Sequence, residues 1–159
     1  MDNIIFLDID GVLINIFPPW RADEVDEDGY SKFNEALTAN LQSLLGFKPD
    51  LKIVLSSSRR IGKDLGRLEA IFAFRGIKGR LIDKIPDPGE TYLSRAQEIS
   101  QYIDKHRVNN FLIIDDDKSL LQLPEGYQKG VILTNYRDGF NEDCLKAAMA
   151  KIEAWQNLA

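Results

Sequence analysis

Residues 3–11 read NIIFLDIDG, and this stretch decides the fold class. Its first part is an almost continuous apolar run, which is typical of a strand buried in a parallel sheet. The run ends in Asp8 and Asp10, so two carboxylates leave the strand together at its carboxyl end. Gly11 permits a sharp turn directly after them. The stretch therefore predicts a buried strand whose end opens onto a small, strongly acidic site.

Four later stretches are predicted to be strands of the same sheet. They are short apolar runs, separated by segments in which apolar residues recur at helical spacing. The predicted strands are residues 51–55, a short one at 80–82, 110–114 and 131–133. The predicted helices are one carrying Phe33, Leu37, Leu41 and Leu44 and stopped by Gly46 and Pro49, one over residues 61–74, one carrying Tyr92, Ala96, Ile99 and Ile103, and a last one that begins at Asn141 and turns Leu145, Met149 and Ile152 inward.

Strands and helices thus alternate along the whole chain. This order predicts an α/β fold of three layers, α/β/α and Rossmann-like, with a mainly parallel central sheet. With 159 residues, the chain fits a single domain over residues 1–159. Residues 12–30 are irregular and include Trp20 and Tyr30, so we expect a flap over the site rather than a separate cap domain.

Composition excludes several classes of protein. The net charge of −5 argues against nonspecific polyanion binding by the whole surface. With His106 as the only histidine, a site with two histidine ligands is excluded, and Cys144 has no partner for an internal disulfide. No apolar run reaches the roughly 18 residues of a membrane span. We expect a cytoplasmic protein without membrane partners, and the oligomeric state stays open.

A second acidic cluster follows the predicted strand at residues 110–114. It consists of Asp115, Asp116 and Asp117. In a parallel sheet, ligands bind beyond the carboxyl ends of the strands, where these acids, Asp8 and Asp10 would meet. Like charges at short range need a cation, and hard oxygen ligands favour Mg²⁺. Three consecutive acids do not all point at one ion, so we expect Asp117 to be structural or to face solvent.

The order of these motifs resembles the haloacid dehalogenase superfamily. Its first motif, Asp-x-Asp-Gly, matches residues 8–11, and its second motif, a serine or threonine after the next strand, matches Ser56 or Ser57. Its acidic fourth motif matches Asp115 with Asp116. The run SSSRR at residues 56–60, then RAQEI at 95–99 and IIDDD at 113–117, is similar to the capless branch described in Swiss Army Knife RNA repair proteins. That branch has tryptophan where this chain has Arg59.

The resemblance implies a magnesium-dependent phosphomonoester hydrolase. Asp8 would attack phosphorus to form an aspartyl-phosphate, and Asp10 would act as general acid and then as general base. The ion would be held by Asp8, the backbone carbonyl of Asp10 and Asp115, with Asp116 in support. Ser56 or Ser57 and a cation would bind the phosphate. Arg95 is the preferred cation, and Lys118 is the alternative.

The substrate and two other functions stay open at this stage. An uncapped site favours a nucleic-acid end or a nucleotide. Arg60, Lys63 and Arg67 recur at helical spacing as a basic stripe, which is either a solvated face or a surface that holds flanking phosphates. A receiver-type phosphoacceptor module also uses aspartates at strand ends. However, the stretch at residues 131–135 lacks the lysine that such a module needs. A noncatalytic subunit that kept the fold is the third alternative.

Overall fold

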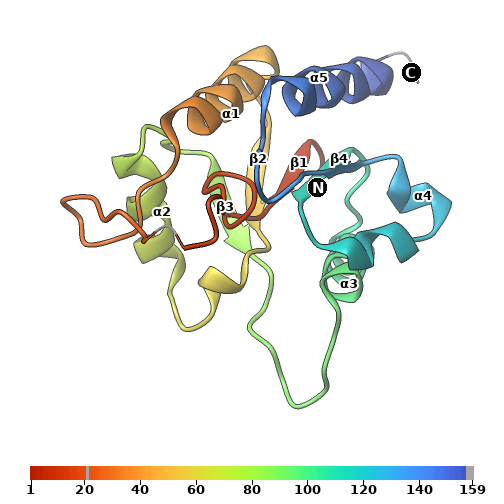
Figure 1. The fold of residues 1–159 in the computed structure, drawn as a ribbon. Helices are drawn as coiled ribbons and strands as arrows, with labels where there is room; N and C mark the ends of the chain where they lie inside the picture. The colour runs from red at the N-terminus through yellow and green to blue at the C-terminus, as the bar shows by residue number, and fades with distance from the viewer. Residues whose placement is uncertain (21, 157–159) are drawn as a thin grey trace.

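The computed structural model describes residues 1–20 and 22–156, which form one parallel sheet covered by helices (Figure 1). The strands are β1 (Ile4–Leu7), β2 (Lys52–Leu55), β3 (Leu81–Lys84), β4 (Phe111–Asp115) and β5 (Val131–Leu133). The α-helices are α1 (Glu35–Phe47), α2 (Leu65–Phe74), α3 (Arg95–His106), α4 (Glu125–Gln128) and α5 (Glu142–Gln156). Two short 3₁₀ helices are η1 (Ser58–Arg60) and η2 (Lys118–Gln122).

The sheet has five strands in the order β3-β2-β1-β4-β5, and every pair is parallel. This arrangement confirms the predicted three-layer α/β class, and the sheet is fully rather than mainly parallel. Since β1 occupies the centre, its carboxyl end is flanked by the ends of β2 and β4. No separate cap domain is seen among the described residues.

The two faces of the sheet carry two apolar clusters, which the alternation of side chains along each strand separates. Ile5 and Leu7 point to the face covered by α1, α2 and α5. Ile4 and Phe6 point to the opposite face, where α3 and η2 pack. All four of these β1 side chains are at most 1% exposed. The central strand is therefore fixed from both sides, and Asp8 directly follows it.

Side-chain caps fix where the longer helices begin. Asn34 accepts a hydrogen bond from Leu37 N at the start of α1, and Asp64 accepts one from Arg67 N at the start of α2. Ser94 and Gln97 form a capping box at the start of α3. The predicted cap at Asn141 is also present, because its side chain accepts the Cys144 N–H at 3.0 Å. Capping of this kind stabilises a helix by about 1 kcal/mol.

Some predicted boundaries were wrong for local reasons. The helix expected over residues 61–74 begins only at Leu65, because Gly62 adopts a φ of +74° and separates η1 from the Asp64 cap. The first helix, by contrast, ends at Phe47, between the two residues that were predicted to stop it. The short strand expected at residues 80–82 lies at Leu81–Lys84. Helices η2 and α4 were not predicted, since they are too short to show periodicity.

Candidate active site

The register of the sheet places Asp8 between Ser56 and Asp115. Leu7 pairs with Leu55 of β2 on one side and with Ile114 of β4 on the other. Ser56 N donates to Leu7 O at 2.9 Å, and Asp8 N donates to Ile114 O at 3.1 Å. The residues that follow these pairs therefore lie in a row at the carboxyl edge of three adjacent strands.

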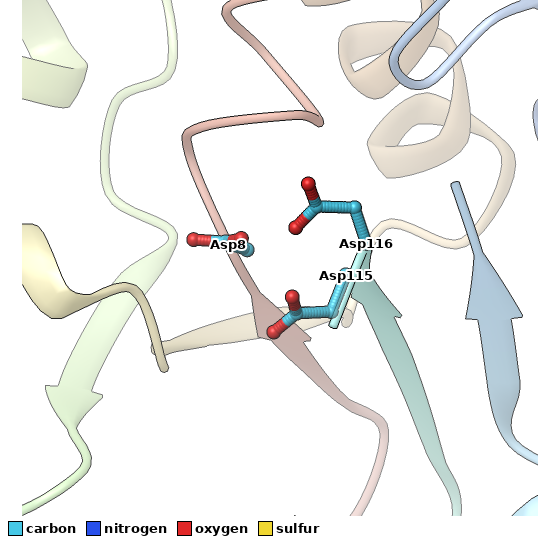
Figure 2. Close-up of side chains that lie close together, drawn as sticks. All are labelled: Asp8, Asp115 and Asp116. Atoms are coloured by element: carbon cyan, nitrogen blue, oxygen red, sulfur yellow. The ribbon is translucent and has the colours of Figure 1, made fainter. Parts of the chain in front are cut away.

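Three carboxylates meet at this edge (Figure 2). Asp8, Asp115 and Asp116 each offer an oxygen, and these oxygens lie within 4.8 Å of one another. Asp8 is 5% exposed and Asp115 is fully buried, whereas Asp116 is half-buried. The cluster unites residues from β1 and from the end of β4, as the sequence predicted. Such a set of hard oxygen donors suits a divalent cation of the Mg²⁺ type.

The acids perturb one another because they share a poorly solvated volume. Burial, followed by the charge of Asp115, raises the pKa of Asp8 to about 9, although the Arg95 guanidinium acts in the opposite direction. Burial and Asp115 also raise the pKa of Asp116. Without a cation, the cluster therefore retains a proton at neutral pH. A divalent ion would replace that proton and balance the carboxylates.

Gly11 lets the chain turn away beside the cluster. Its φ is +80°, and a Cβ at this position would lie 2.3 Å from Asp116 Oδ2. Only glycine satisfies both conditions without displacing that carboxylate. Thr134, which follows β5, holds the turn by donating its hydroxyl to Gly11 O at 2.7 Å. The glycine of the first motif thus makes the close approach of Asp116 possible.

Arg95 brings a positive charge to the cluster from the first turn of α3. Its Nη1 donates to Asp115 Oδ2 at 2.6 Å and lies 3.7 Å from Asp8 Oδ1. Glu98, one turn further along α3, lies 3.8 Å from Arg95 Nε. The alternative cation, Lys118, is exposed at the start of η2. Of the two predicted cations, Arg95 is the one that the structure places against Asp8.

Asp10 lies outside the three-acid cluster and is paired with Arg59. Arg59 Nε and Nη2 donate to the two carboxylate oxygens of Asp10 at 2.6 and 2.9 Å. Arg59 Nη1 also donates to Ser31 Oγ at 3.1 Å, and the guanidinium lies 5.4 Å from the centre of the Tyr30 ring. No role in the site was predicted for Arg59. Its position directly after the serines was the only signal.

The two candidate serines differ in their hydrogen bonds. Ser56 is fully buried, and its hydroxyl has no hydrogen-bond partner among the described residues. Ser57 is also buried, but its Oγ accepts the Arg59 N–H at 3.2 Å and so caps η1. Ser57 is therefore engaged in capping this short helix. Because Ser56 also lies beside Asp8 in the register, its hydroxyl is the better placed of the two for a ligand.

The predicted basic stripe is interrupted, because Arg67 is exposed and Lys63 half-buried but Arg60 is turned inward. Arg60 is 1% exposed and donates to the backbone oxygens of Ser56 and Ser57 at 3.1 and 3.2 Å. It also bonds to the loop after β3 and forms an ion pair with Glu98. The stripe was predicted on a continuous helix, whereas η1 turns Arg60 inward. Arg60 instead joins the end of β2 to α3.

Two aromatic residues of the flap, Tyr30 and Trp20, have opposite environments. Tyr30 is 9% exposed, and its ring lies under the guanidinium groups of Arg59 and Arg75. Trp20 is 83% exposed.

Of the last acidic residues, Asp117 caps η2 by accepting the Ser119 N–H at 2.8 Å, which agrees with the structural role expected for it.

Comparison with known families agrees with this geometry. The family model described as the HAD domain in Swiss Army Knife RNA repair proteins matches residues 4–145. The chain belongs to this family. The match covers both acidic motifs and confirms the resemblance seen in the sequence. The HAD domain family indicates a hydrolase of the phosphoesterase type.

The other comparisons add no relative. No curated protein and no solved structure matches the chain at a significant level. Within the described part of this HAD domain, none of the helices is both long enough and apolar enough to cross a membrane.

Proposed function

We propose that this HAD domain is a Mg²⁺-dependent phosphomonoester hydrolase whose nucleophile is Asp8. The observation that carries the proposal is the meeting of Asp8 with Asp115 and Asp116 at one sheet edge. Three carboxylates with oxygens within 4.8 Å of one another are stable together only with a proton or a cation. We further propose that residues 1–159 act as one catalytic domain in the cytoplasm.

The first half of the proposed reaction transfers the phosphoryl group to the protein. A carboxylate oxygen of Asp8 attacks phosphorus, and the bond from phosphorus to the ester oxygen breaks on the opposite side. Asp10 donates a proton to that ester oxygen as the alcohol leaves. The products of this half-reaction are the free alcohol and an aspartyl-phosphate on Asp8.

The second half releases inorganic phosphate. Asp10, now ionised, accepts a proton from a water molecule that attacks phosphorus and breaks the bond to Asp8. Asp8 is thereby restored as a carboxylate, and Asp10 holds the proton needed for the next cycle. Asp10 lies two residues after Asp8 and directly before the turn at Gly11, so both acids leave the end of β1 on one short segment. This spacing supports the assignment of both proton transfers to Asp10.

The metal and phosphate contacts follow from the same arrangement. Asp8, the backbone carbonyl of Asp10 and Asp115 would hold Mg²⁺, with Asp116 as direct or water-mediated support. When bound, the ion offsets the negative charge of the acids and of the phosphate oxygens. The Ser56 hydroxyl supplies a buried donor beside Asp8, and Arg95 supplies a cation 3.7 Å from Asp8 Oδ1. Ser57 remains a supporting donor.

The preferred substrate class is a phosphorylated nucleic-acid end or a nucleotide. Two observations support this choice. The family is described from RNA repair proteins, and no cap domain encloses the site among the described residues. An open site accepts large substrates, whereas fold alone does not decide between them.

A phosphate-release assay tests the proposal. Purified protein with Mg²⁺ is offered 3′- and 5′-phosphorylated oligonucleotides, mononucleotides, sugar phosphates and phosphopeptides, and Asp8→Asn serves as the matched control. We expect Mg²⁺-dependent turnover that is lost in Asp8→Asn. Activity that survives Asp8→Asn would exclude Asp8 as nucleophile. Phosphate trapped on one aspartate without turnover would indicate a receiver-type module, and no reaction at all would indicate a noncatalytic subunit.

A further inference from the structure

A cavity of about 450 Å³ lies between the flap and the beginning of α1. Asp10 and Arg59 form part of its wall, so it opens directly onto the candidate general acid. The acids of the three-carboxylate cluster are not among its described lining residues. The rest of the wall comes from the flap and from residues 32–36 at the start of α1.

The position of Asp10 indicates which part of a substrate this cavity would hold. In phosphoryl transfer, the attacking oxygen and the leaving oxygen lie roughly in line on opposite sides of phosphorus. With Asp8 as nucleophile and Asp10 as proton donor, the leaving oxygen lies on the side of Asp10. The alcohol attached to that oxygen therefore extends past Asp10, where the cavity begins.

A second cavity, of about 580 Å³, lies between α3 and the loop after β3 and is not next to the proposed proton donor. Arg95, Glu98 and Tyr102 line it, but Asp10 does not belong to its described lining. It therefore opens beside the cation that faces Asp8 and Asp115 rather than beside the proton donor. Of the two cavities, the one beneath the flap has the geometry for a leaving group.

The charges of the flap cavity restrict the leaving group further. Its two basic side chains within the described residues are each near two carboxylates. Arg59 pairs with Asp10 and lies 3.7 Å from Asp23, while Lys32 lies 4.0 Å from Glu24 and 3.8 Å from Glu35. A second phosphate would have to compete with these carboxylates for the same cations.

The size and the uncharged part of the wall suit a small organic group. A volume of about 450 Å³ falls within the range of roughly 300–1,000 Å³ typical of small-ligand sites. Ile14, Ile16 and Pro18 offer apolar surface, and Asn15, whose oxygen accepts a hydrogen bond from Asn34, offers its amide nitrogen. This mixture matches a molecule that has both a flat apolar part and hydroxyl groups.

We propose that the cavity beneath the flap is the leaving-group subsite and that it takes a neutral alcohol of about nucleoside size. The inference rests on the proposed phosphatase function and narrows its substrate class. Instead of nucleic-acid ends or nucleotides in general, the substrates are monoesters that carry no second phosphate near the reacting one. Arg59 is a positioning residue in this subsite, because it holds the Asp10 carboxylate through two hydrogen bonds.

The test fills each cavity with an indole ring. Ala36→Trp blocks the flap cavity from α1, and Ala22→Trp blocks it from the flap, so a folding defect in one variant leaves the other usable. Gln101→Trp blocks the cavity along α3. Ala147→Trp is the matched control, because Ala147 is exposed on α5 and lines neither cavity. Circular dichroism checks the folding of each variant.

Each variant is assayed for phosphate release from adenosine 5′-monophosphate and from acetyl phosphate, whose leaving group is small. We expect Ala36→Trp and Ala22→Trp to raise the KM for the nucleotide at least tenfold more than the KM for acetyl phosphate. Ala147→Trp should change neither value. The wild type should also use adenosine 3′,5′-bisphosphate at least fivefold less efficiently, in kcat/KM, than the monophosphate.

The possible failures are distinguishable. A wild type that releases phosphate from none of these three compounds and from no member of the wider substrate panel overturns the proposed function itself. An active wild type in which the folded flap-cavity variants behave like Ala147→Trp overturns only the subsite. A selective effect of Gln101→Trp on the nucleotide places the leaving group along α3 and also overturns it. A kcat/KM for the bisphosphate that equals or exceeds that for the monophosphate overturns the inference that the leaving alcohol is neutral.

Discussion

At the scale of single residues, the site depends on charges that are close together and poorly solvated. Asp8 is held between an acid that raises its pKa and an arginine that lowers it. Asp10, only two residues later, has a separate arginine partner in Arg59. The two acids of the first motif thus have different electrostatic environments. A cation at the cluster would let Asp8 ionise, as a nucleophile requires, whereas Asp10 already has a cationic partner of its own.

The raised pKa of Asp8 predicts how the stability of the metal-free protein depends on pH. The pKa is about 9 in the folded chain against an ordinary value of 3.8. Between these values, the folded state holds a proton that the unfolded state has lost, so the free energy of unfolding falls as pH rises. We expect a clear decrease from pH 5 to pH 8.5 in urea denaturation with a chelator present.

Asp8→Asn is the control for that measurement, because an amide does not titrate. Its unfolding free energy should fall less over the same interval. Mg²⁺ requires the ionised carboxylate, so its stabilising effect on the wild type should increase with pH. An identical pH slope in wild type and Asp8→Asn would contradict the assignment of the raised pKa to Asp8.

Replacing the two alternative cations decides which of them serves the reaction. Arg95 lies against Asp115 and Asp8, whereas Lys118 is exposed on η2. We expect Arg95→Met to lower kcat by about 10²–10³, as for the loss of a preorganised charge at the reacting group. Lys118→Met should stay within about twofold of the wild type. Steady-state phosphate release measures both, and the reverse order would assign the role to Lys118.

At the scale of elements, the flap is anchored to the end of α2 by one arginine. Arg75 donates two hydrogen bonds to Asp28, at 2.6 and 2.9 Å, and a third to Tyr30 O at 3.1 Å. Its Nη2 also lies 3.2 Å from Asp26 Oδ2. Arg75 therefore holds the second half of the flap in place and keeps Tyr30, at the end of the flap, beneath Arg59.

Removing this anchor should destabilise the protein in a pH-dependent way. The hydrogen bonds from Arg75 lower the pKa of Asp28 to about 2. That stabilisation is complete above the ordinary pKa of 3.8 and is lost as pH falls toward 2. At pH 7, Arg75→Met should lower the free energy of unfolding by about 1–3 kcal/mol.

Denaturation curves at several pH values check this prediction. The difference between wild type and Arg75→Met should shrink as pH falls from about 4 to about 2. Lys78→Met is the control, because Lys78 is exposed near the same end of α2. A difference that stays constant down to pH 2 would mean that Arg75 acts through packing rather than through its charge.

At the scale of the whole molecule, the central strand joins the two apolar clusters. Phe6 is fully buried, and its ring lies 5.5 Å from that of Tyr102 and 6.2 Å from that of Phe111. Phe6→Ala should therefore lower the free energy of unfolding by about 3–5 kcal/mol. Val25→Ala, at a position 62% exposed, should change it little. Urea denaturation compares the two variants, and similar effects would contradict this view of the core.

How far the sequence predicts the structure depends on the range of the interactions. The meeting of Asp8 with Asp115 was predictable, because the carboxyl ends of parallel strands share one edge. The strand order was not, since nothing local specifies which strands are neighbours. The pair of Arg59 with Asp10 and the burial of Arg60 were also missed. Both depend on the single turn of η1, and a short 3₁₀ turn leaves no periodic pattern.

The central place of β1 has a consequence for synthesis of the chain. Ile4 pairs with Phe111 across 107 positions of sequence, so β1 is synthesised well before this partner strand. Until that partner emerges, β1 presents an unpaired edge, which is the kind of surface that invites association with other chains. Contacts this distant along the chain also slow folding. The three clustered carboxylates would consequently come together only after β4 has been synthesised.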